Sequence, residues 1–348
     1  MEQDQHIQKQ PKSEYFDKSL VILCAMNAYA MGHFKIYTKL FWHVIGAPPS
    51  SSTIAIDCAK LATMLLRVAH DSQLREKYSA QIALSRILGA GASSIGDWIK
   101  FGAQSARDIS LLEQKGLVSI SPLQNYGLRY HSQLMEEISP LCAREILAQI
   151  VELIKQSMEY SHSGHAEYAT SQMNDYIIRH LIISPTGPYR RGKATLPAKS
   201  ILEDNQCGSN GKGIELIVTT GITFEPTFCR QLHNFLRHSP AYVCWITITK
   251  NYISFLYRYN STRIVRVDIK YVPFLAHYVT LLFDTGPFTF VQRVKDRIAE
   301  RNLAVTKNNE LVRERTEANA RIIEKIAIGS ERELFTKLDI PYIEPHLR

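Results

Sequence analysis

The stretch RIVRVDIKYV, residues 263–272, has the alternation of a β-strand with two unlike faces. Its apolar face consists of Val265, Val267, Ile269 and Tyr271. Its other face consists of Ile264, Arg266, Asp268 and Lys270. The stretch GIELIVTT, residues 213–220, repeats this pattern: Glu215 is on one face of the strand, and Ile214 and Leu216 are on the other. One acid on the open face of each of two strands is typical of sites that hold two metal ions for phosphoryl transfer. A pair of solvated surface acids is the alternative.

Outward from these strands, the sequence predicts an α+β fold. Residues 241–249 and 252–259 are β-branched and aromatic, and a helix is expected over 227–238, just after Pro226. These segments predict a mixed, largely antiparallel sheet. Residues 15–154 carry helical spacing broken by turn residues, which predicts six to eight short helices. After residue 284 we expect helix again, including the charged run at 311–327.

Composition excludes several classes of protein. The chain has 348 residues, of which 45% are hydrophobic and 21% charged, so it is globular and long enough for two or more packed units. Residues 1–14 are polar and the longest apolar stretch, 20–31, is shorter than the roughly 20 residues of a membrane span. The six cysteines have no C-x-x-C spacing. We therefore expect an intracellular protein with reduced thiols and no membrane partner, whose net charge of +8 hints at a polyanion.

A glycine-rich turn lies between two expected helices. The run ILGAGASS, residues 87–94, precedes a helical stretch at 95–101. This order is the layout of a helix–hairpin–helix, in which glycines allow the tight turn and the amides of the second helix face a phosphate. A turn between two core helices is the alternative.

Together with GPYRRGK at 187–193, the order of these motifs resembles the family X DNA polymerases, the group of polymerases beta, lambda and mu and terminal transferase. The box is similar to the family's Gly-Ser-(Tyr/Phe)-Arg-Arg-Gly-Lys. The run RVDI at 266–269 is similar to the strand that bears the family's third catalytic aspartate. LLFDTG at 281–286 resembles the family's L-L-Y-F-T-G, and PYIEP at 341–345 resembles the closing run of the family's thumb. The resemblance covers roughly residues 15–348.

The resemblance implies five parts and a nucleic-acid partner. The parts are a polar tail at 1–14, a small helical lyase-like DNA-binding domain at 15–78, helix–hairpin–helix fingers at 79–150, a nucleotidyltransferase palm at 151–283 and a small thumb at 284–348. The implied partner is gapped DNA or the ends of a double-strand break, with a deoxynucleoside triphosphate if the protein is active. A role in DNA repair implies a nuclear location, and a monomer is expected.

The resemblance also implies roles for single residues. Asp268 and Glu215 would be the catalytic residues and the ligands of Mg²⁺ or Mn²⁺. The nucleotide would contact Gly187, Arg190, Arg191, Gly192 and Gly286. DNA would contact Ser85, Ile87, Gly89, Ala90, Gly91, Ser93, Ser94 and Lys295, with a monovalent cation held at the hairpin.

Several positions depart from the family pattern at the site of chemistry. The first of the two palm aspartates corresponds to Gly213 and the second to Glu215. Glycine offers no metal ligand, although Glu203 or Asp204 in the insertion at 194–212 would be substitutes. The box serine is Pro188, and Asp284 replaces an aromatic residue. In the lyase-like domain, Thr63 stands where the Schiff-base lysine is expected, with Lys60 about one turn away.

These departures leave three functional hypotheses. The first is an active or residually active DNA polymerase in gap repair or end joining. The second is a catalytically inactive member that binds and holds gapped or broken DNA. The third is an interaction role of the fold without DNA.

Overall fold

The computed structural model describes residues 80–81, 83–163, 181–192, 213–220, 226–260, 262–317 and 320–348. The polar tail, the lyase-like domain with Lys60 and Thr63, and Glu203 and Asp204 lie outside the described residues. The chain divides into two compact units, and the described residues pass from the first to the second after His131. No described helix is both long enough and apolar enough to cross a bilayer.

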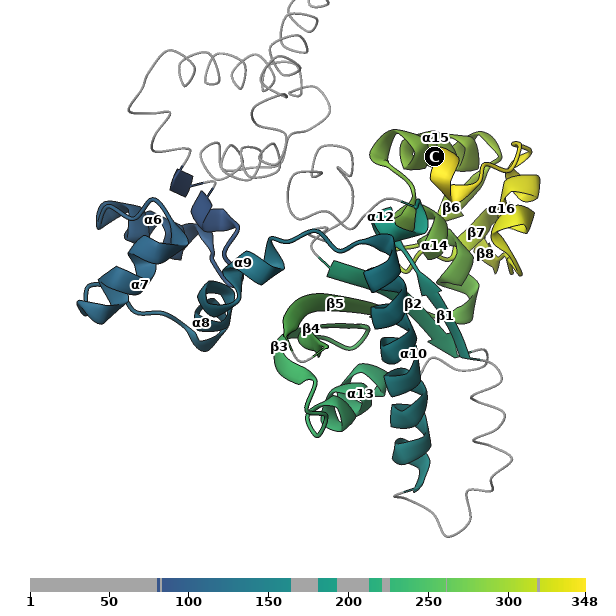
Figure 1. Cartoon of the computed structure of the whole chain (residues 1–348). Helices are drawn as coiled ribbons and strands as arrows, with labels where there is room; N and C mark the ends of the chain where they lie inside the picture. Colours follow the sequence, from purple (N-terminus) through teal and green to yellow (C-terminus); the bar gives the residue numbers. More distant parts are fainter. Residues whose placement is uncertain are drawn as a thin grey trace, which may run out of the picture. The chain divides into compact units, whose positions relative to one another are not determined.

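In the first unit, the helices that the structure describes are short and follow the glycine-rich turn (Figure 1). α6 spans Ala92–Lys100, α7 spans Ala106–Gln114 and α8 spans Pro122–Arg129; α9, His131–Leu134, reaches into the second unit. A capping box begins each of α7 and α8, in which the side chain of each residue bonds the backbone N–H of the other. The two residues are Ser105 and Asp108 in α7, and Ser121 and Gln124 in α8. Among the described residues of this unit, a buried apolar cluster is formed by Leu84, Ile87, Trp98, Ala103 and Ile109.

A five-stranded sheet forms the centre of the second unit. Its order is β1 (Leu181–Pro185), β2 (Gly213–Thr220), β5 (Arg263–Tyr271), β4 (Tyr252–Tyr259) and β3 (Tyr242–Ile248). Only β2 and β5 run parallel; the other pairs are antiparallel. The mixed, largely antiparallel sheet and its four predicted strands are confirmed, as is the α+β class.

Two helices cover one face of this sheet (Figure 1). They are α10 (Pro140–Ser163) and α13 (Phe228–Leu236), the latter within the predicted range 227–238. Their apolar side chains share a buried cluster with the apolar faces of β2 and β5, and Phe228 stacks on Tyr271 with ring centroids 4.4 Å apart. The opposite face therefore carries Glu215 and Asp268. The expected fingers–palm boundary at 150/151 falls within α10, which contributes to this core on both sides of that point.

The described elements after β5 lie between residues 274 and 347, and several of them share a second core cluster. They are η2 (Phe274–Ala276), α14 (His277–Thr285), α15 (Phe288–Glu300), β6 (Leu303–Val305), β7 (Leu311–Glu317), β8 (Ala320–Lys325), α16 (Glu331–Leu338) and η3 (Pro345–Leu347). The helix expected after residue 284 is confirmed in α15, whose Val291, Val294 and Ile298 are buried in this cluster. The short helix α12 (Gly187–Arg190) lies against α14.

The helix expected over 311–327 is wrong. This segment forms β7 and β8, which pair antiparallel in a three-stranded sheet of order β6-β7-β8. Leu, Arg and Glu favour helices only weakly, by fractions of a kcal/mol per residue (about 0.7 at most), and tertiary contacts override this preference. Here strand pairing with β6 buries Leu311 and Val312, which a lone exposed helix would not do.

Candidate catalytic and DNA-binding site

The two predicted catalytic acids lie side by side. In the parallel pairing of β2 with β5, Glu215 is the register partner of Asp268, so both side chains emerge from the face that α10 and α13 leave uncovered. Asp268 is only 4% exposed, and Glu215 is half-buried. Asp268 is therefore not a solvated surface acid, which was the alternative for this position.

The carboxylate of Asp268 is bound by its own neighbours. Arg266 approaches both oxygens, with Nε 2.9 Å from Oδ2 and Nη2 2.9 Å from Oδ1. The hydroxyl of Tyr252 donates to Oδ1 at 2.5 Å. Burial, and then the charge of Asp268, raise the pKa of Tyr252 to about 12, so the phenol stays a donor. Burial, the largest single effect, lowers the pKa of Arg266, but the charges of Asp268 and Tyr252 and the hydrogen bonds to both together raise that pKa above its ordinary value. The acid thus sits in an internal ion-pair cluster.

Gly213 allows the close approach of β2 to β5. A Cβ at this position would lie 2.9 Å from the carbonyl carbon of Arg266 and 3.0 Å from its Cβ, and closer still to the carbonyl oxygen. Backbone cannot yield as the end of a flexible side chain can. The position that matches the family's first aspartate therefore has no room for any side chain.

The described residues do not fit a two-metal centre. Such a centre needs carboxylate oxygens that converge around both ions. Within the described ranges no group of three or more His, Cys, Asp or Glu side chains is placed to hold a metal ion. Asp268 and Glu215 are two acids, and Gly213 adds none.

The two box arginines bind protein groups. Arg190 makes a bidentate pair with Glu331, at 3.1 Å from Nη1 to Oε1 and 2.9 Å from Nη2 to Oε2. Arg191 is 5% exposed and donates from Nη1 to the carbonyl oxygen of Thr285 at 2.5 Å. Glu331 also accepts from Arg348 at 2.8 Å. These contacts join α12 to the ends of α14 and α16.

Sequence patterns do not indicate the roles of Glu331 and Arg348. Arg190, Glu331 and Arg348 are far apart along the chain, so no local spacing predicts that they form a cluster. The only local signal is the N-cap Ser330, which places Glu331 in the first turn of α16. The other box positions are consistent with a tight turn, because Gly187 has φ of 66° and Gly192 has φ of 72°. Pro188 is buried.

The hairpin of the first unit has the predicted turn. Gly89 has φ of 81°, and its carbonyl oxygen accepts from Nε2 of Gln124 at 3.2 Å. The hydroxyl of Ser94 bonds both the N–H and the carbonyl of Gly91, so it caps α6. Gly91 and Ser93 are exposed, whereas Ile87 is buried and its carbonyl accepts the N–H of Ala90 at 3.0 Å. Ser85 and Ala90 are half-buried.

Gly127 lets α8 pack directly on this hairpin. A Cβ on Gly127 would lie 2.9 Å from the backbone nitrogen of Leu88 and 3.0 Å from its carbonyl carbon. The glycine of the run YGLRY at 126–130 therefore places α8 in direct contact with the backbone of the hairpin.

A family model described as the DNA polymerase beta thumb matches residues 280–348. This match supports a family X polymerase-like relationship and DNA binding. It covers the last fifth of the chain, from α14 to the C-terminus, and we call residues 280–348 the thumb. A search of curated proteins found no match.

In the thumb, the predicted residues take different environments. Lys295 is exposed on α15, with its ammonium 5.2 Å from the centroid of the Phe283 ring. Gly286 has no room for a side chain, because a Cβ would lie 2.6 Å from Cδ1 of Phe290. Asp284 pairs with Nζ of Lys270 at 2.5 Å. The charge that Asp284 adds is thus balanced within the protein.

Proposed function

We propose that this protein binds gapped or broken DNA in repair or end joining, and that its nucleotidyl transfer to a primer 3′-hydroxyl is impaired. The thumb match and the order of the motifs support DNA as the partner. The single observation that carries the impairment is the closed space at Gly213 beside Arg266.

The impairment follows from what the chain offers to a metal-dependent reaction. Nucleotidyl transfer needs cations that stabilise the charge on the phosphoryl group. Mg²⁺ or Mn²⁺ would supply that charge, but the described residues do not form a centre for two ions. Arg266 and Tyr252 already bind Asp268, so a metal would have to displace a charge-assisted hydrogen bond. Arg191, the proposed triphosphate ligand, is buried against Thr285.

DNA binding uses surfaces other than the site around Asp268 and Arg191. We place one contact at the hairpin, where Gly91, Ala92 and Ser93 are exposed and a phosphate, with its monovalent cation, would contact backbone groups. We place another at Lys295 on the thumb. A nuclear, monomeric protein fits this role.

The first experiment measures binding by fluorescence anisotropy, using the full chain and a labelled gapped duplex. We expect binding that weakens as salt rises, because phosphate contacts release counterions. Ser93→Glu places a negative charge at the hairpin and should weaken binding about tenfold. Ser119→Glu, an exposed position in the same unit, is the matched control and should have little effect. Absence of binding would favour the interaction role instead.

The second experiment is primer extension on the same duplex with Mg²⁺ or Mn²⁺. We expect no incorporation above that of Asp268→Asn, a variant that keeps the shape of the side chain. Incorporation by the wild-type chain that Asp268→Asn abolishes would contradict the proposed impairment and support the active-polymerase hypothesis.

A further inference from the structure

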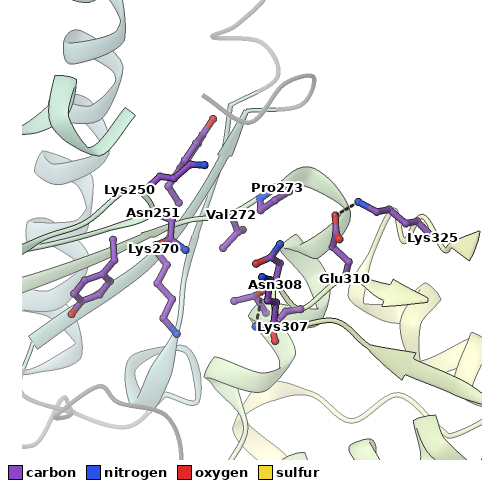
Figure 2. A pocket seen from close by; sticks show the side chains of 13 residues that line it. Lys250, Asn251, Lys270, Val272, Pro273, Lys307, Asn308, Glu310 and Lys325 are labelled. Atoms are coloured by element: carbon purple, nitrogen blue, oxygen red, sulfur yellow. Dashed lines mark hydrogen bonds and ion pairs between the residues drawn. The ribbon is translucent and has the colours of Figure 1, made fainter. Parts of the chain in front are cut away.

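A basic pocket lies in the second unit, and neither box arginine is among its lining residues. It has a volume of about 760 Å³ and is lined by the turn between β3 and β4, the end of β5, α14, and the loop that joins β6 to β7 (Figure 2). Four of its lining residues are lysines: Lys250, Lys270, Lys307 and Lys325. Its single acidic lining residue is Glu310.

Lysines outnumber acids among the residues that line this pocket. Lys325 pairs with Glu310 at 2.8 Å, and Lys270 pairs with Asp284 at 2.5 Å. Lys250 and Lys307 are exposed, and among the described residues Lys307 has no ion-pair partner. Of the charged side chains that line the pocket, four are lysines and one is an acid, Glu310. Several ammonium groups in one concave space raise the local concentration of anions.

The neutral lining favours an anion rich in acceptor oxygens. The Asn251 and Asn308 side chains carry amide donors, and Figure 2 shows them among the lysines. The amide of Asn309 is already used, since its Nδ2 donates to Oγ1 of Thr280 at 3.2 Å. Ammonium and amide donors match phosphate oxygens, and the volume lies within the roughly 300–1,000 Å³ that small-molecule sites occupy.

We propose that this pocket binds a compact polyphosphate, of the size of the triphosphate of a nucleotide. Lys250 and Lys270 belong to the five-stranded sheet and its turn, whereas Lys307 and Lys325 belong to the thumb. The cations thus stand on facing walls of a pocket, an arrangement that suits a small ligand held between them. A bound polyphosphate joins the thumb to the end of the sheet that carries the β3–β4 turn and the last residues of β5. The proposal is independent of DNA binding and of catalysis.

The test is isothermal titration of the full chain with inorganic tripolyphosphate. The variant Lys250→Ala with Lys307→Ala removes one ammonium from each wall, and both positions are exposed, so the fold should be retained. We expect the affinity of this double variant to fall about tenfold or more, since each lost charged hydrogen bond is costly. Lys155→Ala, an exposed lysine on α10, is the control and should bind as the wild type does.

A gain of affinity provides a sharper criterion. Glu310→Gln removes the acid that neutralises Lys325 and should bind tripolyphosphate several-fold more tightly, with near-UV circular dichroism as the check on folding. The gapped duplex is titrated in parallel. Unchanged tripolyphosphate affinity in the double lysine variant would overturn the proposal. So would a loss confined to DNA, which would assign the lysines to the nucleic-acid surface.

Discussion

Gly213 on β2 and Arg266 on β5 are register partners in a parallel pair, and the backbone of Arg266 fills the space that a Cβ on Gly213 would need. The loss of an acid at this position is thus tied to the spacing of two strands. The same Arg266 then binds the acid that remains, Asp268.

Replacing the glycine should therefore harm the fold without restoring chemistry. We expect Gly213→Asp to lower the free energy of unfolding by about 1–3 kcal/mol or more, through overpacking, and to remain inactive in primer extension. Urea denaturation measures the first effect. Gly96→Ala is the control: nothing lies within 4 Å of a Cβ there, and Ala favours α6 by about 0.5–1 kcal/mol. An active, stable Gly213→Asp would refute this explanation.

The buried His277 should make stability depend on pH. Its Nε2 lies 3.0 Å from Oγ of Ser184, and burial, with Arg190 nearby, lowers its pKa from 6.5 to about 4. In the unfolded chain the imidazole ring binds a proton below about pH 6.5, whereas in the folded chain it binds one only below about pH 4. The free energy of unfolding should thus fall by about 3 kcal/mol as the pH drops through this window. Urea titrations at several pH values should show that His277→Gln loses this dependence, and an unchanged slope would contradict it.

Removing the charge of the buried Glu331 should lower the free energy of unfolding more than removing the charge of the more exposed Glu344. It bonds both Arg190 and Arg348, and the Arg348 side chain is 0% exposed. Glu331→Gln leaves two guanidiniums without their counter-charge and should lower the free energy of unfolding by about 3–5 kcal/mol. Glu344→Gln, from the exposed pair with Arg332, should cost about 1 kcal/mol at most. Equal effects of the two variants in thermal denaturation would sink this ranking.

The pair of Lys270 with Asp284 should show strong coupling in a double-mutant cycle. Asp284 has a side chain only 6% exposed, so Lys270→Met leaves a buried carboxylate unpaired and should cost about 1–3 kcal/mol. Adding Asp284→Asn should recover most of this loss, because the charge itself is removed. The exposed pair of Lys100 with Asp97 is the comparison, with coupling below about 1 kcal/mol. Additive effects at Lys270 and Asp284 would show that the pair contributes nothing.

Much of the fold was accessible from local patterns. The alternation in 213–220 and 263–272 predicted two strands and placed Glu215 and Asp268 on the uncovered faces, because side-chain direction in a strand depends only on residue parity. The turn at Gly89 was predicted for the same kind of local reason. The segment 311–327 was not, because its residue types suit a helix and only pairing with β6 makes it a sheet.

The sequence by itself determined the strands, the glycine turn, the box and the thumb motif, all of which rest on periodicity or on short runs of residues. Only the tertiary structure decided what the charged residues of the box and strands do. Arg190 meets Glu331, Arg191 meets Thr285, and Asp268 meets Arg266 and Tyr252. The physical reason is that a buried charge must find a partner, and the nearest partner in space is set by how strands and helices pack rather than by spacing along the chain.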